Sequence, residues 1–322
     1  MRAGSEGTFL AVDVGATNLR VALFRGNELQ AKSVVRTPTT GGPYAVARKI
    51  LREAERLGAD RVDAVGVATI GPLDIKKGMV IDTPNNPLRT FYLREPLEKE
   101  FKAKVVVAND CVAAVWGEKV LGRGRDVEDL AYVTISSGIG GGFIVDGNLI
   151  VGWRGNAHEV GHLVVDYKAE IRCGCGGLGH WEALASGAGI PRMAYIKAKT
   201  WRGVPTEAYK LASQMKLDAP GLYRLARNGD YFARELVREL NKIHAAGIAS
   251  IASAFDPKIV FLGGSIFLNN TDLMLDEIKG FLGEYTLLEP PRIEVATFRE
   301  DAPLMGALAL VLKTPEVIKK PW

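Results

Sequence analysis

Apolar residues along the chain gather in short unbroken runs, separated by stretches rich in glycine, asparagine and proline. The run Thr8–Val14 is followed by a glycine turn and by a second run, Leu19–Phe24, and the chain then reverses at Arg25–Asn27. Short apolar runs bounded by turn residues predict buried strands. The N-terminal segment is therefore expected to form a strand, a glycine loop, a second strand and a hairpin turn.

The same layout recurs 121 residues further along the chain. Ala131–Ile135 and Phe143–Val145 are apolar, the glycine-rich stretch Ser136–Gly142 lies between them, and a turn follows at Asp146–Asn148. The two segments superpose without a gap, so that the two turns coincide. Asp-Gly between apolar runs is a strong hairpin signal because the turn needs positive φ. The repeat predicts a duplicated α/β unit, one copy in each half of the chain, with a cleft between the halves.

The rest of the pattern predicts helices and strands that complete two lobes. A chain of 322 residues exceeds the usual size of one compact domain. We expect a small lobe at residues 1–121, completed by a C-terminal helix within 299–322, and a large lobe at 122–298 with a Cys- and His-rich insert near 155–189. Helices are expected at Tyr44–Leu57, Asp110–Val120, Glu207–Met215, Tyr231–Ala254 and Arg299–Leu312, strands at Val62–Ala68, Lys104–Val107 and Lys258–Leu262, and a loop at Gly71–Pro87.

Composition and charge exclude several classes of protein. Apolar residues make up 47% and charged residues 24% of the chain, which argues against disorder. The net charge of +4 is too small to indicate a nucleic-acid partner. The apolar stretches Ala245–Phe255 and Met305–Leu312 are shorter than the roughly 18 residues of a membrane span, and Met1–Gly7 leaves no room for a signal peptide. Three cysteines are too few for a disulfide scaffold. We therefore expect a cytoplasmic protein without a membrane or nucleic-acid partner.

Both glycine turns carry groups suited to a phosphate. Asp13–Asn18 places a carboxylate at a strand end, then backbone N–H groups and a hydroxyl, and Ser136–Gly142 offers similar groups with less bulk. A tight hairpin that needs glycine explains either loop alone. Together, in register, they favour two loops that hold one polyphosphate. The sequence contains neither GxxxxGK[ST] nor a GxGxxG that opens a helix after a strand, so the P-loop and dinucleotide interpretations lose their main support.

Two further junctions allow a structural and a functional interpretation. Asn109-Asp110 follows an apolar strand and precedes a helix, where these residue types are preferred N-caps. A carboxylate at such a junction is equally suited to act as a general base toward an attacking hydroxyl. Gly263-Gly264 ends the strand Val260–Leu262, either for close packing or to let a flat nucleotide approach the backbone.

Histidine and cysteine are concentrated in one segment. His162, Cys173, Cys175 and His180 would form a closed, structural two-Cys two-His zinc site. The alternative is a glycine-rich loop with incidental thiols. His158–His162 resembles the HExxH of zinc proteases but has one residue fewer between its histidines, which argues against a protease.

Taken in order, these motifs resemble the ROK family of sugar kinases in the actin/hexokinase-like superfamily. The resemblance runs from about Phe9 to about Leu312. It implies a two-lobed, ribonuclease H-like duplicated α/β fold with a cleft between the lobes. The motifs that carry it are DVGATNLRVALF from Asp13, ND-x-x-AA-x-x-GE from Asn109 to Glu118, TISSGIGGG from Thr134, ExGH from Glu159, the segment Cys173–Glu182, and IVFLGGSI from Ile259.

The resemblance implies ATP, magnesium and a hexose as ligands, and a structural zinc ion. It makes Asp110 the general base and Asn109 a sugar contact. Sugar hydroxyls are expected to bind Glu159, His162 and Glu182, with Asn85 and Gly71 of the small-lobe loop. His162 is expected to use one ring nitrogen on the zinc and the other on the sugar. The expected phosphate and magnesium residues are Asp13, Gly15, Thr17 and Asn18 in the first loop and Ser137, Gly138, Gly140 and Gly141 in the second, with Gly263 and Gly264 beside adenosine.

Three departures from the family pattern bear on these expectations. His180 stands where the family usually has cysteine, which leaves the fourth zinc ligand in question. The small-lobe loop reads Ile70-Gly71-Pro72, whereas the family usually has proline directly before this glycine. The segment Asn85–Arg89 also lacks the Gly-Trp that usually follows its proline. The last two departures lie in the expected sugar loop and put the preferred hexose in question.

The expected activity is that of a glucokinase or broad-specificity hexokinase of carbohydrate metabolism and glycolysis, which phosphorylates the 6-hydroxyl. An N-acetylhexosamine or fructose kinase is the alternative within this class. A sugar-responsive repressor would need a helix-turn-helix before the first phosphate-loop strand, where only eight residues precede Phe9. A non-catalytic sugar-binding protein would be expected to have lost the base or a phosphate loop. The sequence leaves a homodimer open.

Overall fold

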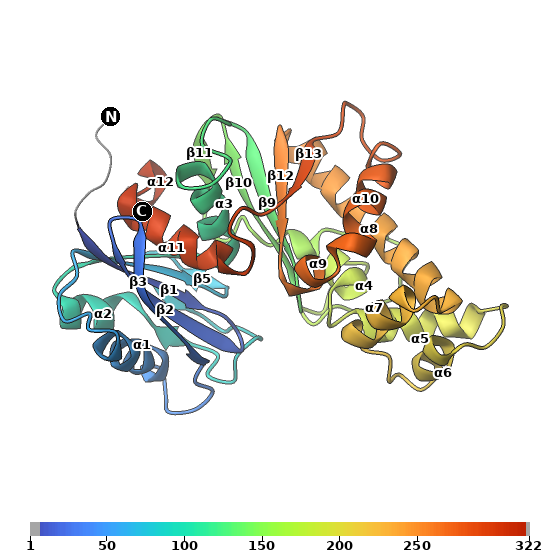
Figure 1. Cartoon of the computed structure of the whole chain (residues 1–322), viewed down its shortest axis with the longest axis horizontal. Coiled ribbons are helices and arrows are strands. Elements are labelled where there is room, and N and C mark those ends of the chain that lie inside the picture. Colours follow the sequence, from blue (N-terminus) through green and yellow to red (C-terminus); the bar gives the residue numbers. More distant parts are fainter. Residues whose placement is uncertain (1–6, 320–322) are drawn as a thin grey trace. The chain divides into compact units, whose positions relative to one another are not determined.

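The computed structural model describes residues 7–319 of the chain (Figure 1). These residues divide into two compact units. Unit 1 comprises residues 7–132, 142–158 and 296–319, and unit 2 comprises residues 133–141 and 159–295. The lobe limits expected from the sequence, with boundaries after residues 121 and 298, stay a prediction.

Unit 1 is built on a five-stranded sheet with the order β3-β2-β1-β4-β8. The first three strands are antiparallel neighbours, and β4 and β8 run parallel to β1. Its elements are β1 (Thr8–Val14), β2 (Asn18–Arg25), β3 (Glu28–Arg36), α1 (Ala45–Arg56), β4 (Ala64–Thr69), β5 (Leu73–Asp74), β6 (Met79–Val80), β7 (Phe91–Tyr92), α2 (Arg94–Phe101), β8 (Lys104–Asn109), α3 (Asp110–Val120), the 3-10 turn η2 (Arg299–Asp301), α11 (Ala302–Leu312) and α12 (Glu316–Lys319).

Helix α11 packs on the sheet and on α3. Small residues allow this close approach. A side chain at Gly66 of β4 would collide with the carbonyl of Ala307, and one at Gly306 would collide with the backbone of Ala113. Buried aliphatic side chains from β1, β4 and β8 fill the interior on the α1 side of the sheet. The interior of unit 1 therefore contains apolar residues from both the N-terminal and the C-terminal parts of the chain.

The second sheet repeats the topology of the first. Its order is β11-β10-β9-β12-β13, and the boundary between the two units falls within β9 and β10. The turns predicted from the sequence connect β2 to β3 and β10 to β11, with φ values of 58° at Gly26 and 71° at Gly147. The predicted duplication is confirmed by these matching strand orders. The strands are β9 (Leu130–Ile135), β10 (Ile139–Val145), β11 (Asn148–Ile150), β12 (Ile259–Gly263) and β13 (Arg292–Val295).

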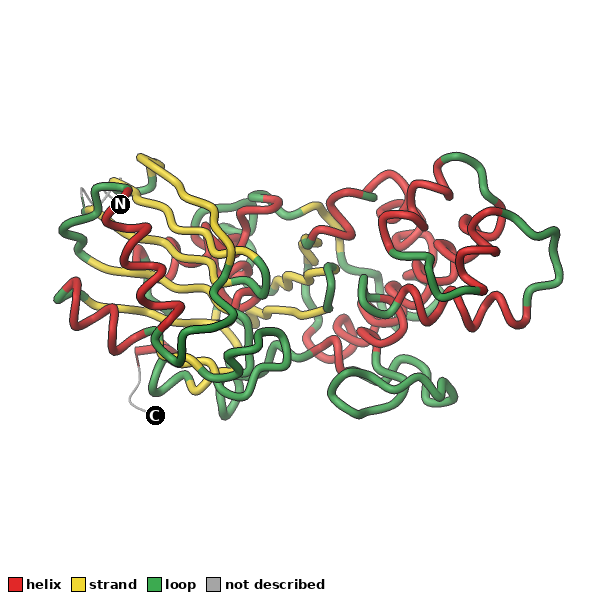
Figure 2. The backbone as a smooth tube through the Cα atoms, turned by 90° about the horizontal axis from the view of Figure 1, so that it is seen from below, coloured by secondary structure: helices red, strands yellow, loops and turns green. Residues whose placement is uncertain are grey.

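Unit 2 consists mostly of helices that follow a long loop segment. This segment, between β11 and α4, is drawn largely as loop in Figure 2. The helices are the 3-10 turn η1 (Val160–His162), α4 (Trp181–Ala185), α5 (Ile190–Thr200), α6 (Glu207–Ser213), α7 (Ala219–Arg227), α8 (Tyr231–Phe255), α9 (Ser265–Asn269) and α10 (Thr271–Leu282). The 25-residue helix α8 contacts α4, α6, α7 and α10, and so forms the centre of the helical part.

A buried histidine of α8 supports α4. The indole Nε1 of Trp181 donates a hydrogen bond to Nδ1 of His244 (3.1 Å), and His244 is fully buried. Burial lowers the pKa of His244 to about 3. The folded protein therefore keeps this imidazole neutral, with its proton on Nε2, down to a pH at which the unfolded chain has already taken up a proton.

We expect this histidine to make the folded protein less stable in acid. Its folded-state pKa lies below the unfolded value of about 6.5, so stability falls by about 1.4 kcal/mol per pH unit as pH drops from about 6 to 4. The variant His244→Asn keeps an acceptor for Trp181 and does not titrate in this range. Urea unfolding at pH 7, 6, 5 and 4 should give a shallower pH slope for the variant. Equal slopes for the two proteins would contradict the assignment.

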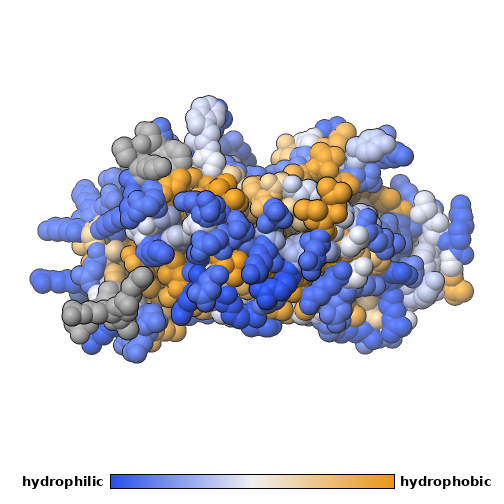
Figure 3. Space-filling view, turned by 90° about the horizontal axis from the view of Figure 1, so that it is seen from above, coloured by the Kyte–Doolittle hydropathy of each residue, from blue (hydrophilic) through white to orange (hydrophobic). Residues whose placement is uncertain are grey.

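No helix in the part of the chain that the structure describes is long and apolar enough to cross a membrane. On the face seen in Figure 3, hydrophilic side chains are interspersed with smaller apolar areas.

Candidate functional site

The first glycine loop joins β1 to β2 as a tight turn. Gly15 N donates a hydrogen bond to the carbonyl of Asn18 (2.9 Å), and a Cβ on Gly15 would lie 2.9 Å from the same oxygen. The side chains of Thr17 and Asn18 are exposed. Thr37, which lies outside the turn in sequence, stabilises it with two hydrogen bonds. Its Oγ1 donates to the carbonyl of Gly15 (2.8 Å), and its N donates to the carbonyl of Thr17 (3.0 Å). The turn thus has a fixed backbone and free side chains, which suits a phosphate.

Asp13, the carboxylate of this loop, is buried and paired with Arg20. The two residues are register partners on β1 and β2, and Arg20 Nη1 lies 2.5 Å from Asp13 Oδ2. Burial raises the pKa of Asp13, and the guanidinium of Arg20 opposes this effect. Sequence reasoning did not single out Arg20. An arginine in a strand otherwise read as buried is the signal that could have found it.

Asn109 and Asp110 occupy the junction of β8 and α3, and the structure separates their roles. Asn109 is the N-cap: its Oδ1 accepts hydrogen bonds from Cys111 N (2.8 Å) and Val112 N (3.3 Å). Asp110 is the first residue of the helix, half-buried, and its Oδ1 accepts from Cys111 N (2.8 Å). Since Asn109 caps the helix, the carboxylate of Asp110 is not needed for that purpose.

Gly71 and Asn85 lie at the two ends of the loop expected to bind sugar. Asn85 is exposed, Gly71 is half-buried, and the Gly71-Pro72 peptide bond is cis. The buried Thr83 contacts the backbone of both residues. Asn86, also buried, donates from Nδ2 to the carbonyl of Pro38 (3.1 Å). Sequence reasoning missed Thr83 and Asn86.

The second glycine segment is only partly a loop. Ser137 and Gly138 lie in the turn after β9, but β10 begins at Ile139, so Gly140 and Gly141 are strand residues. The expectation of a loop over Ser136–Gly142 is wrong in this respect. Glycine suits the strand because a side chain at Gly142 would collide with the carbonyl of Cys111.

Glu182 of α4 reaches the start of β10. Its Oε2 accepts a hydrogen bond from Ile139 N (3.0 Å), and a Cβ on Gly138 would lie 2.6 Å from the same oxygen. A carboxylate expected to bind sugar therefore rests against a glycine expected to bind phosphate. A side chain at Gly138 would therefore push the end of the Glu182 side chain away from this position.

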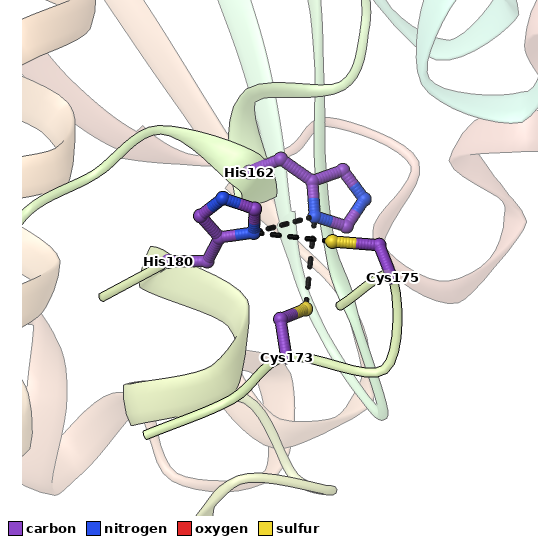
Figure 4. A group of neighbouring side chains, drawn as sticks. All are labelled: His162, Cys173, Cys175 and His180. Carbon is purple, nitrogen blue, oxygen red and sulfur yellow. Dashed lines mark hydrogen bonds between the residues drawn. The ribbon is translucent and has the colours of Figure 1, made fainter. Parts of the chain in front are cut away.

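Four residues of unit 2 converge as a candidate metal site. The side chains of His162, Cys173, Cys175 and His180 point toward one another (Figure 4), and their donor atoms all lie within 4.8 Å of each other. These are the four residues singled out from the sequence. His162 is the last residue of η1 and His180 directly precedes α4, and the two cysteines come from the Cys-Gly-Cys turn between them.

The spacing of the donor atoms suits a tetrahedral ion. Nδ1 of His162 lies 3.3 Å from Nδ1 of His180 and 3.7 Å from Sγ of Cys173, and Sγ of Cys175 lies 3.3 Å from Nδ1 of His180. A tetrahedral zinc with bonds of about 2.0–2.3 Å separates its ligands by roughly 3.3–3.8 Å. Burial raises the pKa of the Cys173 thiol to about 11, so a thiolate there needs a nearby cation. The cluster is compatible with a structural zinc.

The second nitrogen of His162 lies beside a carboxylate. Nε2 of His162 is 3.3 Å from Oε2 of Glu159, within the same unit. The nitrogen expected to face the sugar thus contacts another residue expected to bind the sugar. If Nδ1 of His162 held a metal ion, the carboxylate on Nε2 would fix the orientation of the imidazole.

Gly263 is the last residue of β12, and Gly264 follows it as the N-cap of α9 and has a packing role. Gly264 has a φ of 88°, and a Cβ there would lie 2.5 Å from the carbonyl of Ile135 on β9. The positive φ and the close approach to the backbone of β9 are sufficient to require glycine at this position.

Comparison with known proteins identifies the family. The ROK family model matches residues 9–314. The chain belongs to the ROK family. This ROK protein is 44% identical to a glucokinase from Aeropyrum pernix over 95% of its own length and 97% of the relative's. It is 42% identical to a glucokinase from Pyrobaculum calidifontis, with 97% of each chain covered.

Its fold matches that of a ROK family glucokinase from Streptomyces griseus, solved in complex with glucose and AMPPNP. The TM-score is 0.77 at 29% identity, over 94% of this ROK protein and 99% of that chain. The fold is thus the two-lobed, actin-like α/β fold of the family, with two mixed sheets, as the sequence predicted.

Proposed function

We propose that this ROK protein is an ATP-dependent glucokinase that transfers the terminal phosphoryl group of ATP to the 6-hydroxyl of glucose. The observation that carries the proposal is its high identity, over nearly the full length of both chains, to two glucokinases. The protein is an ATP-dependent sugar kinase, and glucose is the substrate that its relatives' names support. The preference for the 6-hydroxyl comes from the family resemblance.

Residues of unit 1 supply the base and one phosphate loop in this proposal. Asp110 accepts the proton of the attacking hydroxyl, and Asn109 binds the sugar while it caps α3. Gly15, Thr17 and Asn18 hold phosphate oxygens, with Asp13 beside them. A magnesium ion bound with ATP would neutralise the phosphate oxygens. Phosphoryl transfer needs positioning and neutralised charge more than covalent chemistry from the protein, and this set of groups supplies the positioning.

Residues of unit 2 supply the second phosphate segment and most of the sugar contacts. Ser137, Gly138, Gly140 and Gly141 approach phosphate oxygens, and Gly263 and Gly264 lie beside adenosine. Glu159, His162 and Glu182 bind the sugar hydroxyls.

A structural zinc ion held by His162, Cys173, Cys175 and His180 would orient the sugar residues. Support comes from the donor types and from their spacing. Through His162, such an ion fixes Glu159, because the two side chains are in contact. We place the reaction in the cytoplasm, where thiols such as those of Cys173 and Cys175 stay reduced.

The test is sugar-dependent ADP release from ATP and magnesium. Glucose, mannose, fructose, glucosamine and N-acetylglucosamine should be compared in parallel, with Asp110→Asn as the blank. We expect the highest kcat/KM with glucose. Preference for N-acetylglucosamine or fructose would favour an N-acetylhexosamine or fructose kinase instead. If none of the five sugars increased ADP release, the proposed glucokinase activity would be contradicted.

We expect Gly138→Ala to raise KM for glucose by about tenfold, because the added methyl displaces Glu182 from its hydrogen bond with Ile139. KM values for glucose and for ATP should be measured separately. Gly280→Ala is the matched control, since a Cβ there meets open space. A rise confined to KM for ATP would mean that Gly138 serves the phosphates alone.

A further inference from the structure

One buried hydroxyl connects the two ends of the loop expected to bind sugar. Thr83 is fully buried. Its Oγ1 donates a hydrogen bond to the carbonyl of Gly71 (2.7 Å) and accepts one from Asn85 N (3.3 Å). A hydroxyl has one proton to donate and lone pairs to accept with, so a single side chain meets both demands. Gly71 and Asn85 are twelve and two residues away from it in the chain.

The position of Thr83 is itself fixed by the backbone. Thr83 N donates to the carbonyl of Arg89 (2.8 Å), across the turn that contains Asn85. The β-branched side chain has few rotamers, so a fixed backbone leaves the hydroxyl little freedom. The hydrogen bond to the Gly71 carbonyl is partly buried, so loss of the hydroxyl costs this carbonyl its bond to Thr83.

Other contacts hold the loop without Thr83. Ile81 N donates to the carbonyl of Pro72 (2.9 Å), and Leu73 N donates to Oδ1 of Asn156 (3.1 Å). The strand pair β5–β6 lies in the same loop. Loss of the hydroxyl should therefore leave the loop folded and loosen only the spacing between Gly71 and Asn85. This effect is local. We therefore expect a larger change in KM for glucose than in the stability of the protein.

We propose that Thr83 is a positioning residue for the sugar, which acts by holding Gly71 and Asn85 at a fixed separation. The inference rests on the proposed function, because it takes these two residues as sugar contacts. Thr83 itself does not touch the reacting atoms. Its contribution is expected in KM for glucose, with little change in kcat or in KM for ATP.

Thr37 provides a matched control in the same unit. It too is a buried threonine, 4% exposed, whose hydroxyl donates to a glycine carbonyl, that of Gly15 (2.8 Å). Gly15 belongs to the expected phosphate loop. Removal of the Thr37 hydroxyl should therefore raise KM for ATP, whereas removal of the Thr83 hydroxyl should raise KM for glucose.

The experiment compares Thr83→Val, Thr83→Ser and Thr37→Val in the full-length protein. For Thr83→Val we expect KM for glucose to rise about tenfold, with kcat and KM for ATP within about twofold of the wild type. Thr83→Ser restores the hydroxyl and should bring KM for glucose back to within about twofold. Thr37→Val should show the opposite pattern. If Thr83→Val does not fold, Thr83→Cys, whose thiol is a weak donor, should give an intermediate KM for glucose.

Several outcomes would overturn the inference while leaving the proposed function intact. These are an unchanged KM for glucose in Thr83→Val or in Thr83→Cys, an equal rise in both KM values, and failure of Thr83→Ser to restore KM. A lower melting temperature with unchanged KM would likewise assign Thr83 a purely structural role. Absence of glucose-dependent ADP release in the wild type would instead overturn the proposed function, and this inference with it.

Discussion

Replacing Asp110 with asparagine is expected to lower kcat for glucose phosphorylation by about 10²–10⁴-fold, the usual contribution of a general base. Asparagine has the same shape but cannot take the proton of the 6-hydroxyl. The helix should survive, because Asn109 and not Asp110 caps α3. Glucose binding, measured by calorimetry without ATP, should change little. The melting temperature should also stay close to that of the wild type.

Asp256→Asn is the matched control for this substitution. Asp256 is exposed at the C-terminal end of α8 with a φ of 45°, which asparagine tolerates. The same chemical change there should leave kcat unaltered. If Asp110→Asn kept wild-type kcat, Asp110 would be removed as the base. Loss of glucose binding together with stability would point to a structural role.

Removal of the metal is expected to lower stability and to weaken glucose binding together. We expect about one zinc ion per chain by elemental analysis. Removal of an ion present at 1,000 times its Kd costs about 4 kcal/mol of the free energy of unfolding. It also frees His162, which contacts Glu159. Urea unfolding and KM for glucose should be measured with and without a chelator, and zinc should restore both. Purified protein that contains no zinc would refute the four-ligand site.

Cys175→Ala should reproduce the effect of the chelator on both quantities. Cys111→Ala is the control, because Cys111 lies in α3 of the other unit, and it should keep the full zinc content. If Cys175→Ala lowered the free energy of unfolding but left KM for glucose unchanged, the zinc would be structural without orienting the sugar residues.

The duplicated sheets were predictable because their signals are local. The apolar runs and the turns at Gly26 and Gly147 depend on a few neighbouring residues, and the shift of 121 residues aligned them. The strands β5 to β7 have two residues each, too few to show a period. Helix α7 begins with Ala-Pro-Gly, and α10 contains Gly280, so residues that normally interrupt a helix obscured both patterns.

The candidate site was predictable where the residue types by themselves indicate a chemical role. Two cysteines and two histidines within a short segment indicated the cluster that the structure brings together. The contact between Nε2 of His162 and Glu159 depends on side-chain orientation, which spacing does not reveal. Thr83 was missed for a related reason, since a threonine has no special chemistry until folding places its hydroxyl between two chain segments.

The packing of α11 has a consequence for synthesis on the ribosome. Unit 1 needs residues 296–319 to cover β4 and α3, and Thr297 N donates to Oε1 of the buried Glu118 (2.7 Å) at the start of this segment. The N-terminal sheet therefore emerges first but cannot bury its α11 face until almost the whole chain has been translated. During that interval the exposed Gly66 and Ala113 surfaces are open to chaperones, and a nascent chain stalled before Ala302 should be bound by them.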